Sequence, residues 1–480
     1  MTPKQGIERR AMLKLIGFGG ATLMVSDVLP AFAEETDCGE EPYEGKFVIY
    51  ATFDGGWDQL LTTDPRDATD PAYGPSQTID PAYDVIRVSD QGEGSIDATM
   101  TLTNGTGLYQ PEGSNITVGP AMYTLAREHW QDLCIVRGLD MGTLTHAVGK
   151  RYFLTGKFPR GLQANGSSMT TATAAQLTNA SPLPNLVVGM ESYNEDLPAW
   201  SSGMVIANPS DILGVLAPLS EPLSGLTGAT VAGYLSEWSC MDHRLNGDGV
   251  VTNYYDSALK AEDLTSGCYA EYFNFVNPES GSAVDLALTK FGITARGGAA
   301  VSAMAAPSGQ AFLAAQAITN GVAQCVSVRM ANGIDHHDDD WESDHGPAVR
   351  EGMDGLAILI SHLKETLDHN GAPFWDRTVL VVSSDFARTP KRNSRGGRDH
   401  HLSSSCILAG AGIEGNQVIG GTDETYTREL IDPATGAVGG DLVIRPPDVH
   451  ATILSALGLS YEHLSNQDPT LIPAIIKSSG

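Results

Sequence analysis

The sequence contains two short segments in which aspartate and histidine stand side by side, Asp335-His336-His337 and Asp399-His400-His401. With His345, five of the chain's 12 histidines lie in or near these segments. Imidazole and carboxylate groups are the usual protein ligands of zinc and similar divalent metals. The clustering therefore predicts a metal site and favours a metal-dependent hydrolase over a surface turn that merely contains histidine.

The spacing within the first segment separates its residues into two groups. In an extended chain, side chains two residues apart project to the same side, so Asp335 and His337 can bind one metal ion. His336 would point the other way and contact the surroundings of the site. His345 precedes an expected long helix and could approach the same site.

A third acidic position, Asp385, directly follows the apolar run 378–383. A carboxylate beside a buried strand is unfavourable unless it is paired or binds a metal, so we predict that Asp385 is a ligand. The alternative is a structural ion pair with Arg388. Arg388 is also a candidate for neutralising an oxyanion, because a planar guanidinium donates paired hydrogen bonds to phosphate or sulfate.

The second histidine segment follows a basic, glycine-containing loop at 391–397. We predict His400 as a ligand, with Arg398 and Asp399 as groups that orient it, because metal-bound imidazole generally needs a hydrogen-bond partner on its other nitrogen. Arg398 is a second candidate for stabilising developing negative charge.

Thr145 and His146 stand at the start of an expected helix that runs towards Gly156. A hydroxyl at a helix N-terminus beside a metal ion is a plausible nucleophile, although Thr145 could equally be a simple helix cap. His146 could be a metal ligand or a general acid or base.

The elements that must position these residues alternate between apolar, β-branched runs and amphipathic stretches. This alternation predicts an α/β fold with a mostly parallel central sheet flanked by helices. The expected strands are 46–53, 133–137, 186–188, 325–330, 378–383 and 406–409, and the expected helices are 120–130, 168–177, 310–323, 347–370 and 449–457.

Ligands of such sheets bind beyond the carboxyl ends of the strands. Asp335 and Asp385 both follow an expected strand, and Asp54 and Asp58 follow the first one. That shared placement predicts that residues far apart in the sequence meet at one edge of the sheet.

Residues 1–33 carry paired arginines, an apolar stretch too short to span a membrane, and a small-residue cleavage pattern, which together predict a twin-arginine export signal. We divide the remainder into a core at 43–207 and 301–475 and an inserted cap at 208–300, which has more Gly, Ser, Asp and Tyr. The expected location is the periplasm or the outside of the cell.

The formal net charge of -29 argues against nucleic-acid binding, which needs a basic surface. The six cysteines form no CxxC pattern. Three lie in strand-like runs and are expected to be buried, whereas Cys240 and Cys268 could pair after export or remain free. The buried three are Cys134, Cys325 and Cys406.

These motifs resemble the DUF1501 family, exported proteins placed in the alkaline phosphatase-like (sulfatase-like) superfamily. The resemblance covers most of the chain outside the 208–300 segment and is strongest at 376–390. The matching segments are Gly55 to Asp58, Asp64 to Arg66, Leu144 to His146, Thr155-Gly156, Gly333 to His337, Asp376 to Pro390, Gly397 to His400, Leu408 to Gly415 and Gly421 to Asp423.

The resemblance implies an alkaline phosphatase-like fold with one or two divalent metal ions, zinc first and calcium, magnesium or manganese as alternatives. It implies Asp58, rather than Asp54, as a further ligand. The chain departs from the family at position 385, where it has Asp in place of the common Glu, and at position 387, where it has Ala in place of the usual Gly. The sulfatase motif Cys-x-Pro-x-Arg does not occur, so a formylglycine sulfatase is not expected.

From the residues and the resemblance together, we expect an exported metal-dependent hydrolase of a phosphate or sulfate ester. Its substrate would be a small anionic ester or a sulfated or phosphorylated polymer. The alternative is a non-catalytic exported binding or assembly protein that keeps the fold. A mutase or transferase would use the same site and differ only in the acceptor.

Overall fold

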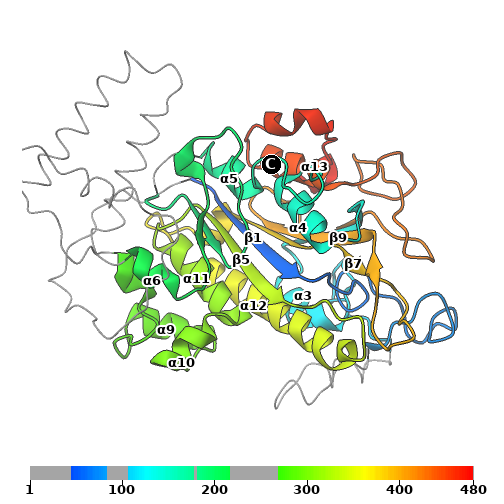
Figure 1. Cartoon of the computed structure of the whole chain (residues 1–480), viewed down its shortest axis with the longest axis horizontal. Helices are drawn as coiled ribbons and strands as arrows, with labels where there is room; N and C mark the ends of the chain where they lie inside the picture. The colour runs from blue at the N-terminus through cyan, green and yellow to red at the C-terminus, as the bar shows by residue number, and fades with distance from the viewer. Residues whose placement is uncertain (1–44, 84–105, 178–180, 217–268, 479–480) are drawn as a thin grey trace, which may run out of the picture. The chain divides into compact units, whose positions relative to one another are not determined.

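The apolar runs expected to form strands pair into one eight-stranded sheet in the computed structural model, which describes residues 45–83, 106–177, 181–216 and 269–478 (Figure 1). The order across the sheet is β10-β2-β9-β6-β1-β5-β3-β4. Its strands are β1 (Phe47–Asp54), β2 (Leu133–Asp140), β3 (Asn185–Val188), β4 (Met204–Ile206), β5 (Cys325–Asn332), β6 (Thr378–Ser384), β9 (Ser403–Gly410) and β10 (Gln417–Ile419).

The sheet is parallel except at one strand. β1 pairs in parallel with β5 and β6, and β3 with β4 and β5. β9 runs antiparallel to both of its neighbours, β2 and β6. The expectation of an α/β fold with a mostly parallel sheet is confirmed. The sequence did not indicate that β9 is reversed, and this reversal matters for the site.

Two apolar cores cover the two faces of the sheet. Alternate residues of β1 divide between them, because successive side chains of a strand point to opposite faces. Phe47, Ile49, Ala51 and Phe53 pack towards the face covered by α3 (Tyr123–His129), α11 (Pro307–Thr319) and α12 (Gly346–Glu365). The other face is covered by α4 (His146–Thr155), α5 (Met169–Ala174) and α13 (Pro446–Ala456). Because both faces of the sheet are buried at β1, the sequence of this strand is apolar at most positions and does not alternate with polar residues.

The five expected helices are all present, with bounds that differ by a few residues. The 120–130 stretch begins as a 3-10 turn, Pro120–Met122, before α3. The sequence did not indicate the short strands β4 and β10, or the small antiparallel pair formed by β7 (Ala387–Arg388) and β8 (His400–His401). These elements have only two or three residues, too few to produce a periodic pattern.

The part of the expected cap that the structure describes consists of α6 (Asp211–Leu216), α9 (Ala283–Lys290), α10 (Gly298–Ala303) and a 3-10 turn, Tyr269–Phe273. Its apolar side chains belong to the same core as α11 and α12. Whether this region acts as a cap stays a prediction. The export signal at 1–33 and the Cys240–Cys268 pair lie outside the described residues.

Two further expectations concern buried thiols and membrane helices. Cys134, Cys325 and Cys406 are buried and free, as predicted. Within the described ranges, none of the helices combines the length and the hydrophobicity that crossing a membrane requires.

Candidate metal centre

The segments with the candidate ligands meet at the edge of the sheet where the parallel strands end. Asp335 follows β5 and Asp385 follows β6 directly. His146 is the first residue of α4, the helix that follows β2. His400 precedes β9, and because β9 runs in the opposite direction, its beginning lies at the same edge. The reversed strand therefore brings His400 to the ends of the others.

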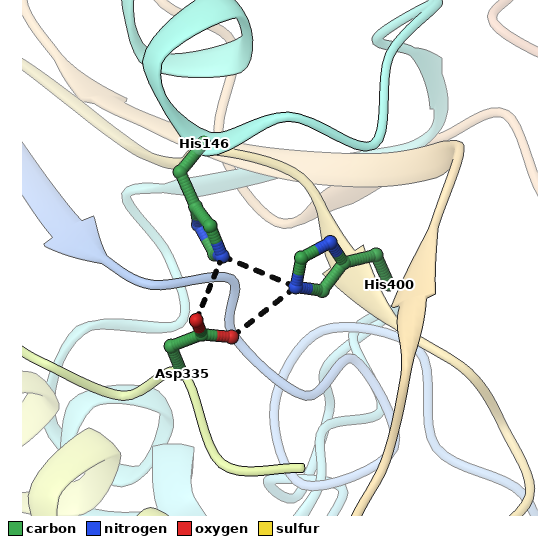
Figure 2. A group of neighbouring side chains, drawn as sticks. All are labelled: His146, Asp335 and His400. Carbon is green, nitrogen blue, oxygen red and sulfur yellow. Dashed lines mark hydrogen bonds and ion pairs between the residues drawn. The ribbon is translucent and has the colours of Figure 1, made fainter.

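Four side chains from these segments point at one another. Figure 2 shows three of them, and His146 Nε2 lies 3.1 Å from His400 Nε2 and 3.1 Å from Asp335 Oδ2. His337 Nε2 lies 2.8 Å from His400 Nε2 and 3.0 Å from Asp335 Oδ1. Asp335 Oδ1 is also 3.2 Å from His400 Nε2. We call His146, Asp335, His337 and His400 the histidine cluster.

The second ring nitrogen of each histidine faces an oxygen that can only accept a hydrogen bond. His146 Nδ1 donates to Asp385 Oδ2 at 2.7 Å. His337 Nδ1 donates to Asp399 Oδ1 at 2.9 Å, and His400 Nδ1 donates to the carbonyl of Leu144 at 2.7 Å. A neutral imidazole has one N–H, so the proton is at Nδ1 in all three rings. Each Nε2 therefore carries a lone pair directed into the cluster.

His400 Nε2 has the Nε2 atoms of His146 and His337 and an oxygen of Asp335 within 3.2 Å, and these lone pairs and the negative charge repel one another unless a cation lies among them. This is the arrangement of a metal site, in which each ligating imidazole donates its other N–H to a carboxylate or carbonyl. The mixed nitrogen and oxygen donors suit zinc and related divalent ions. Among the described residues, His146, Asp335 and His400 form the group whose ligand atoms all lie close enough to share one ion; His337 contacts Asp335 and His400 but is not part of that group.

The cluster is open on one side. Asp335 keeps 44% of its side chain exposed, and His337 keeps 27%. A bound ion would therefore have a face accessible to water or substrate, which catalytic zinc sites have and structural zinc sites lack.

The ionisation of the cluster matches a ligand role. Burial alone would raise the pKa of Asp335, but the hydrogen bond and the positive charge of Arg388 oppose it, and the pKa lies well below its usual value. Desolvation lowers the pKa of His400. The carboxylate is therefore charged and the imidazole neutral near pH 7, the states in which both bind metal.

Arg388 is fully buried, and its guanidinium binds protein oxygens and lies 3.4 Å from His337 Nε2. The guanidinium donates to Asp335 Oδ1 at 2.6 Å, to the carbonyl of Gly56 at 3.0 Å and to that of Arg398 at 3.0 Å. It also donates to the carbonyls of Gly55 and Ile334. Arg388 therefore fixes the Asp335 carboxylate and joins the loops after β1 and β5. The structural ion pair of Arg388 is made with Asp335 and not with Asp385.

Asp385 lies behind the cluster. Its Oδ2 accepts from His146 Nδ1 and from the backbone N–H of Gly55 at 3.0 Å. Burial raises the pKa of Asp385, and the hydrogen bond from His146 opposes that rise. In this position the carboxylate orients His146 and does not itself join the four converging groups.

Asp58, predicted as a ligand, lies in a separate, fully buried group with Arg398. Asp58 Oδ2 is 2.9 Å from Arg398 Nε, and both side chains are at most 1% exposed. The backbone N–H of Asp58 donates to His345 Nε2 at 3.2 Å, and the Arg398 guanidinium lies 4.5 Å from the centre of the Trp341 ring. We call Asp58, Arg398, His345 and Trp341 the Asp58-Arg398 group.

Charges within the Asp58-Arg398 group are balanced by protein groups alone. Burial raises the pKa of Asp58 despite the opposing guanidinium, and burial lowers the pKa of His345 well below its usual value. Arg398 also donates to the carbonyl of Thr389 at 2.9 Å and to that of Asp80. Arg398 therefore pairs with Asp58 inside the protein, and the structure does not bring Asp58 to the histidine cluster.

Thr145 is exposed and extended at the N-cap of α4, where its side chain makes no capping hydrogen bond. Thr145 is thus adjacent to a cluster residue with its hydroxyl free of the cap role. Close approach of α4 to β6 depends on Gly149, where a Cβ would lie 2.1 Å from the carbonyl oxygen of Asp385.

Sequence reasoning missed two features of the site. Asp399 orients His337, a residue from the other histidine segment, and not its neighbour His400. The two segments approach so closely because position 397 is glycine, where a Cβ would lie 2.2 Å from the backbone of His337. The other histidines of the two Asp-His-His segments, His336 and His401, lie outside the histidine cluster. His336 contacts His345, and His401 contacts the backbone of Ser403.

Comparison with protein families gives one match, over residues 45–468, to the family described as "Protein of unknown function (DUF1501)". Comparison with curated proteins gives no match. The family expected from the motifs therefore covers most of the chain.

Several solved structures are similar to the fold at low identity. The phosphonate monoester hydrolase SpPMH from Silicibacter pomeroyi is 11% identical, covers 91% of this chain and 78% of its own, and has a TM-score of 0.37. The PsFucS1 sulfatase from Pseudoalteromonas sp. is 12% identical, with coverages of 87% and 68% and a TM-score of 0.32. The alkaline phosphatase from the Antarctic bacterium TAB5 is 10% identical, with coverages of 78% and 95% and a TM-score of 0.30. Similarity at this level decides neither substrate nor mechanism.

Proposed function

The chain belongs to the DUF1501 family, and we propose that it is an exported hydrolase that uses a divalent metal ion to cleave a phosphate or sulfate ester. One observation carries this proposal. His400 Nε2 lies 2.8–3.2 Å from the Nε2 atoms of His146 and His337 and from an oxygen of Asp335, and the Nδ1 atoms of all three rings are occupied as donors.

We assign His146, Asp335, His337 and His400 as the ligands and zinc as the preferred ion. A bound divalent ion would polarise the ester oxygen and lower the pKa of a coordinated water. Asp385 and Asp399 are positioning residues, since they hold the rings of His146 and His337 by their Nδ1 atoms. Loss of such partners weakens metal binding without removing a ligand.

Arg388 and Arg398 are better suited to positioning than to binding an oxyanion. Both guanidinium groups are fully buried and bind protein oxygens, and Arg388 also lies 3.4 Å from His337 Nε2. Arg388 holds Asp335 at the edge of the cluster, and Arg398 holds Asp58 in its own buried group. Developing negative charge on a substrate would therefore be stabilised at the cluster itself.

The nucleophile is the hydroxyl of Thr145 or a water molecule. Thr145 is exposed beside His146, at the positive end of the α4 helix dipole. Because His146 Nε2 is directed into the cluster, we assign His146 as a ligand and not as the general base.

The expected substrate is an anionic ester, small or part of a sulfated or phosphorylated polymer. The protein's charge of -29 repels anions at long range, so attraction has to arise locally at the cluster. Export through residues 1–33 would place the reaction in the periplasm or outside the cell.

The test is turnover of p-nitrophenyl phosphate, bis(p-nitrophenyl) phosphate and p-nitrophenyl sulfate by protein purified with its metal. We expect His400→Ala to abolish turnover of whichever ester is cleaved, while the neighbouring change His401→Ala retains it. Thr145→Ala separates the nucleophiles: lost turnover with unchanged metal content assigns the hydroxyl, and retained turnover assigns water. Stoichiometric metal without turnover of any ester would instead favour an exported binding or assembly protein.

A further inference from the structure

A second pair of carboxylates lies beside the histidine cluster. Phe53 of β1 pairs with Ser384 of β6, so the residues that follow them, Asp54 at the end of β1 and Asp385 just after β6, lie at neighbouring positions. Both are buried, at 8% and 1% exposure. Two adjacent buried carboxylates repel each other unless a cation lies near them.

The positive charge nearest to this pair of carboxylates belongs to the side chain of Lys150. Lys150 lies one helical turn after His146 on α4, so the two side chains project from the same face of the helix. Lys150 Nζ is 3.0 Å from Asp54 Oδ2, and the guanidinium of Arg329 is 3.8 Å from the same oxygen. The two carboxylates are thus matched by two cationic groups.

Within the described part of the chain, one carboxylate oxygen of the Asp54–Asp385 pair lacks a hydrogen-bond donor. Asp385 Oδ2 is used by His146 and Gly55, but its Oδ1 is buried and has no hydrogen-bond partner among the described residues. Such an atom is unfavourable unless a water or an ion satisfies it. Asp54 Oδ2 and Asp385 Oδ1 would therefore be available to a metal ion if the ammonium group were absent.

We propose that Lys150 is a built-in cation for the Asp54–Asp385 pair and limits this protein to one divalent metal ion, bound in the histidine cluster. This inference rests on the proposed function. The resemblance of the sequence motifs to a family of hydrolases implied one or two divalent ions and did not decide between them. Lys150 delivers a single positive charge where a second metal ion would deliver two. Together with Arg329 it thereby balances the negative charge of the Asp54–Asp385 pair, and a water molecule is enough to satisfy Asp385 Oδ1.

The histidine cluster and the Asp54–Asp385 pair offer different ligand atoms, so metal binding to each can be measured separately. The histidine cluster offers mainly nitrogen and prefers zinc. The Asp54–Asp385 pair offers oxygen alone, which suits Mn²⁺, Mg²⁺ or Ca²⁺. An oxygen-only site opened by removing Lys150 should accept Mn²⁺ while zinc stays in the cluster.

The experiment starts from protein carrying about one zinc ion per chain. Mn²⁺ is added, and the free ion is measured by electron paramagnetic resonance. Lys150→Met should bind about one additional Mn²⁺ per chain, while the wild type binds none beyond the background set by Asp54→Asn. Lys150→Arg keeps the charge and should behave like the wild type, and Lys150→Met/Asp54→Asn should lose the new site.

Lys157→Met is the matched control, because it removes a lysine just after the same helix without touching the carboxylate pair. The inference is overturned if the wild type binds Mn²⁺ above the Asp54→Asn background, a result that does not depend on any lysine variant folding. It is also overturned if Lys150→Met, folded by circular dichroism, binds no more Mn²⁺ than Lys157→Met. Failure of the proposed function has a different signature, which is a wild type that retains no zinc.

Discussion

Two groups that combine aspartate and histidine differ in how their charges are balanced. In the Asp58-Arg398 group the guanidinium lies 2.9 Å from the carboxylate, and both are fully buried. In the histidine cluster the Nε2 atoms face one another, the carboxylate is 44% exposed, and the guanidinium of Arg388 contacts the carboxylate and His337 Nε2. In the first group the carboxylate is paired with an arginine, whereas in the second the imidazole lone pairs face one another and a partly exposed carboxylate.

The difference explains why residue type alone does not identify a metal site. Both groups contain an aspartate shortly after a strand and a histidine nearby. What separates them is the partner of each polar atom: Asp58 is paired with a buried arginine, whereas the three imidazoles donate from Nδ1 to outer acceptors, as metal-binding histidines do. Substitutions in the two groups should therefore have different consequences, and the largest is expected in the cluster.

The largest effect is expected from His400→Ala. It removes the imidazole whose Nε2 contacts three other members of the cluster. Metal content should fall below about a tenth of an equivalent, as measured by elemental analysis, with turnover lost in parallel. Metal content that stays at the wild-type level would remove His400 from the ligand set.

Arg398→Met should act on stability and not on metal. Removing one partner of a buried ion pair leaves the other charge uncompensated, which costs about 3–5 kcal/mol in the free energy of unfolding. Urea unfolding measures the loss, and the folded fraction should keep its metal. The double change Arg398→Met/Asp58→Asn should recover part of the stability. If Arg398→Met instead releases metal from a folded protein, the two groups are not independent.

Asp399→Asn should give an intermediate effect confined to metal affinity. The change weakens the acceptor that fixes His337 Nδ1, and loss of such a partner typically reduces metal affinity about 10–100-fold. Competition with a chromogenic chelator measures the change. Asp338→Asn, which alters only an exposed pair with Arg395, is the matched control and should leave affinity unaltered.

The smallest effect is a difference in pH dependence. Desolvation lowers the pKa of His400 below its unfolded value of about 6.5. Its contribution to stability is therefore fully present above about 6.5 and is lost as the pH falls through the lowered folded pKa. Protonation also removes its lone pair, so metal affinity should fall over the same acidic range. Calorimetry with and without zinc should show the metal-dependent stabilisation shrinking below about pH 6.5; a constant shift down to about pH 4 would contradict the ligand state assigned to His400.

Much of the fold follows from the sequence because buried parallel strands leave a strong pattern. The run Thr378–Ser384 is β-branched and apolar, and it was expected as a strand. The direction of β9 could not be predicted, because strand patterns carry no information on orientation. That direction is what brings His400 to the cluster.

The site was predictable in part. Asp335, His337 and His400 were expected as ligands and lie together in the structure, and His146 was expected as a ligand or as a general acid or base. The sequence could not separate Asp58 from them, because its pairing with Arg398 joins positions that are far apart along the chain. Asp399 was expected to orient His400 and instead accepts from His337, and Asp385 was expected as a ligand and instead accepts from His146. Both differences depend on ring orientation and not on spacing.

The most direct measurement is anomalous X-ray scattering from crystals grown with zinc. The assignment predicts a peak at the centre of the histidine cluster, about 2.0–2.2 Å from the Nε2 atoms of His146, His337 and His400 and from an oxygen of Asp335. A peak beside Asp58, or crystals of zinc-treated protein with no peak between the three imidazoles, would contradict the central claim that these residues form the metal site.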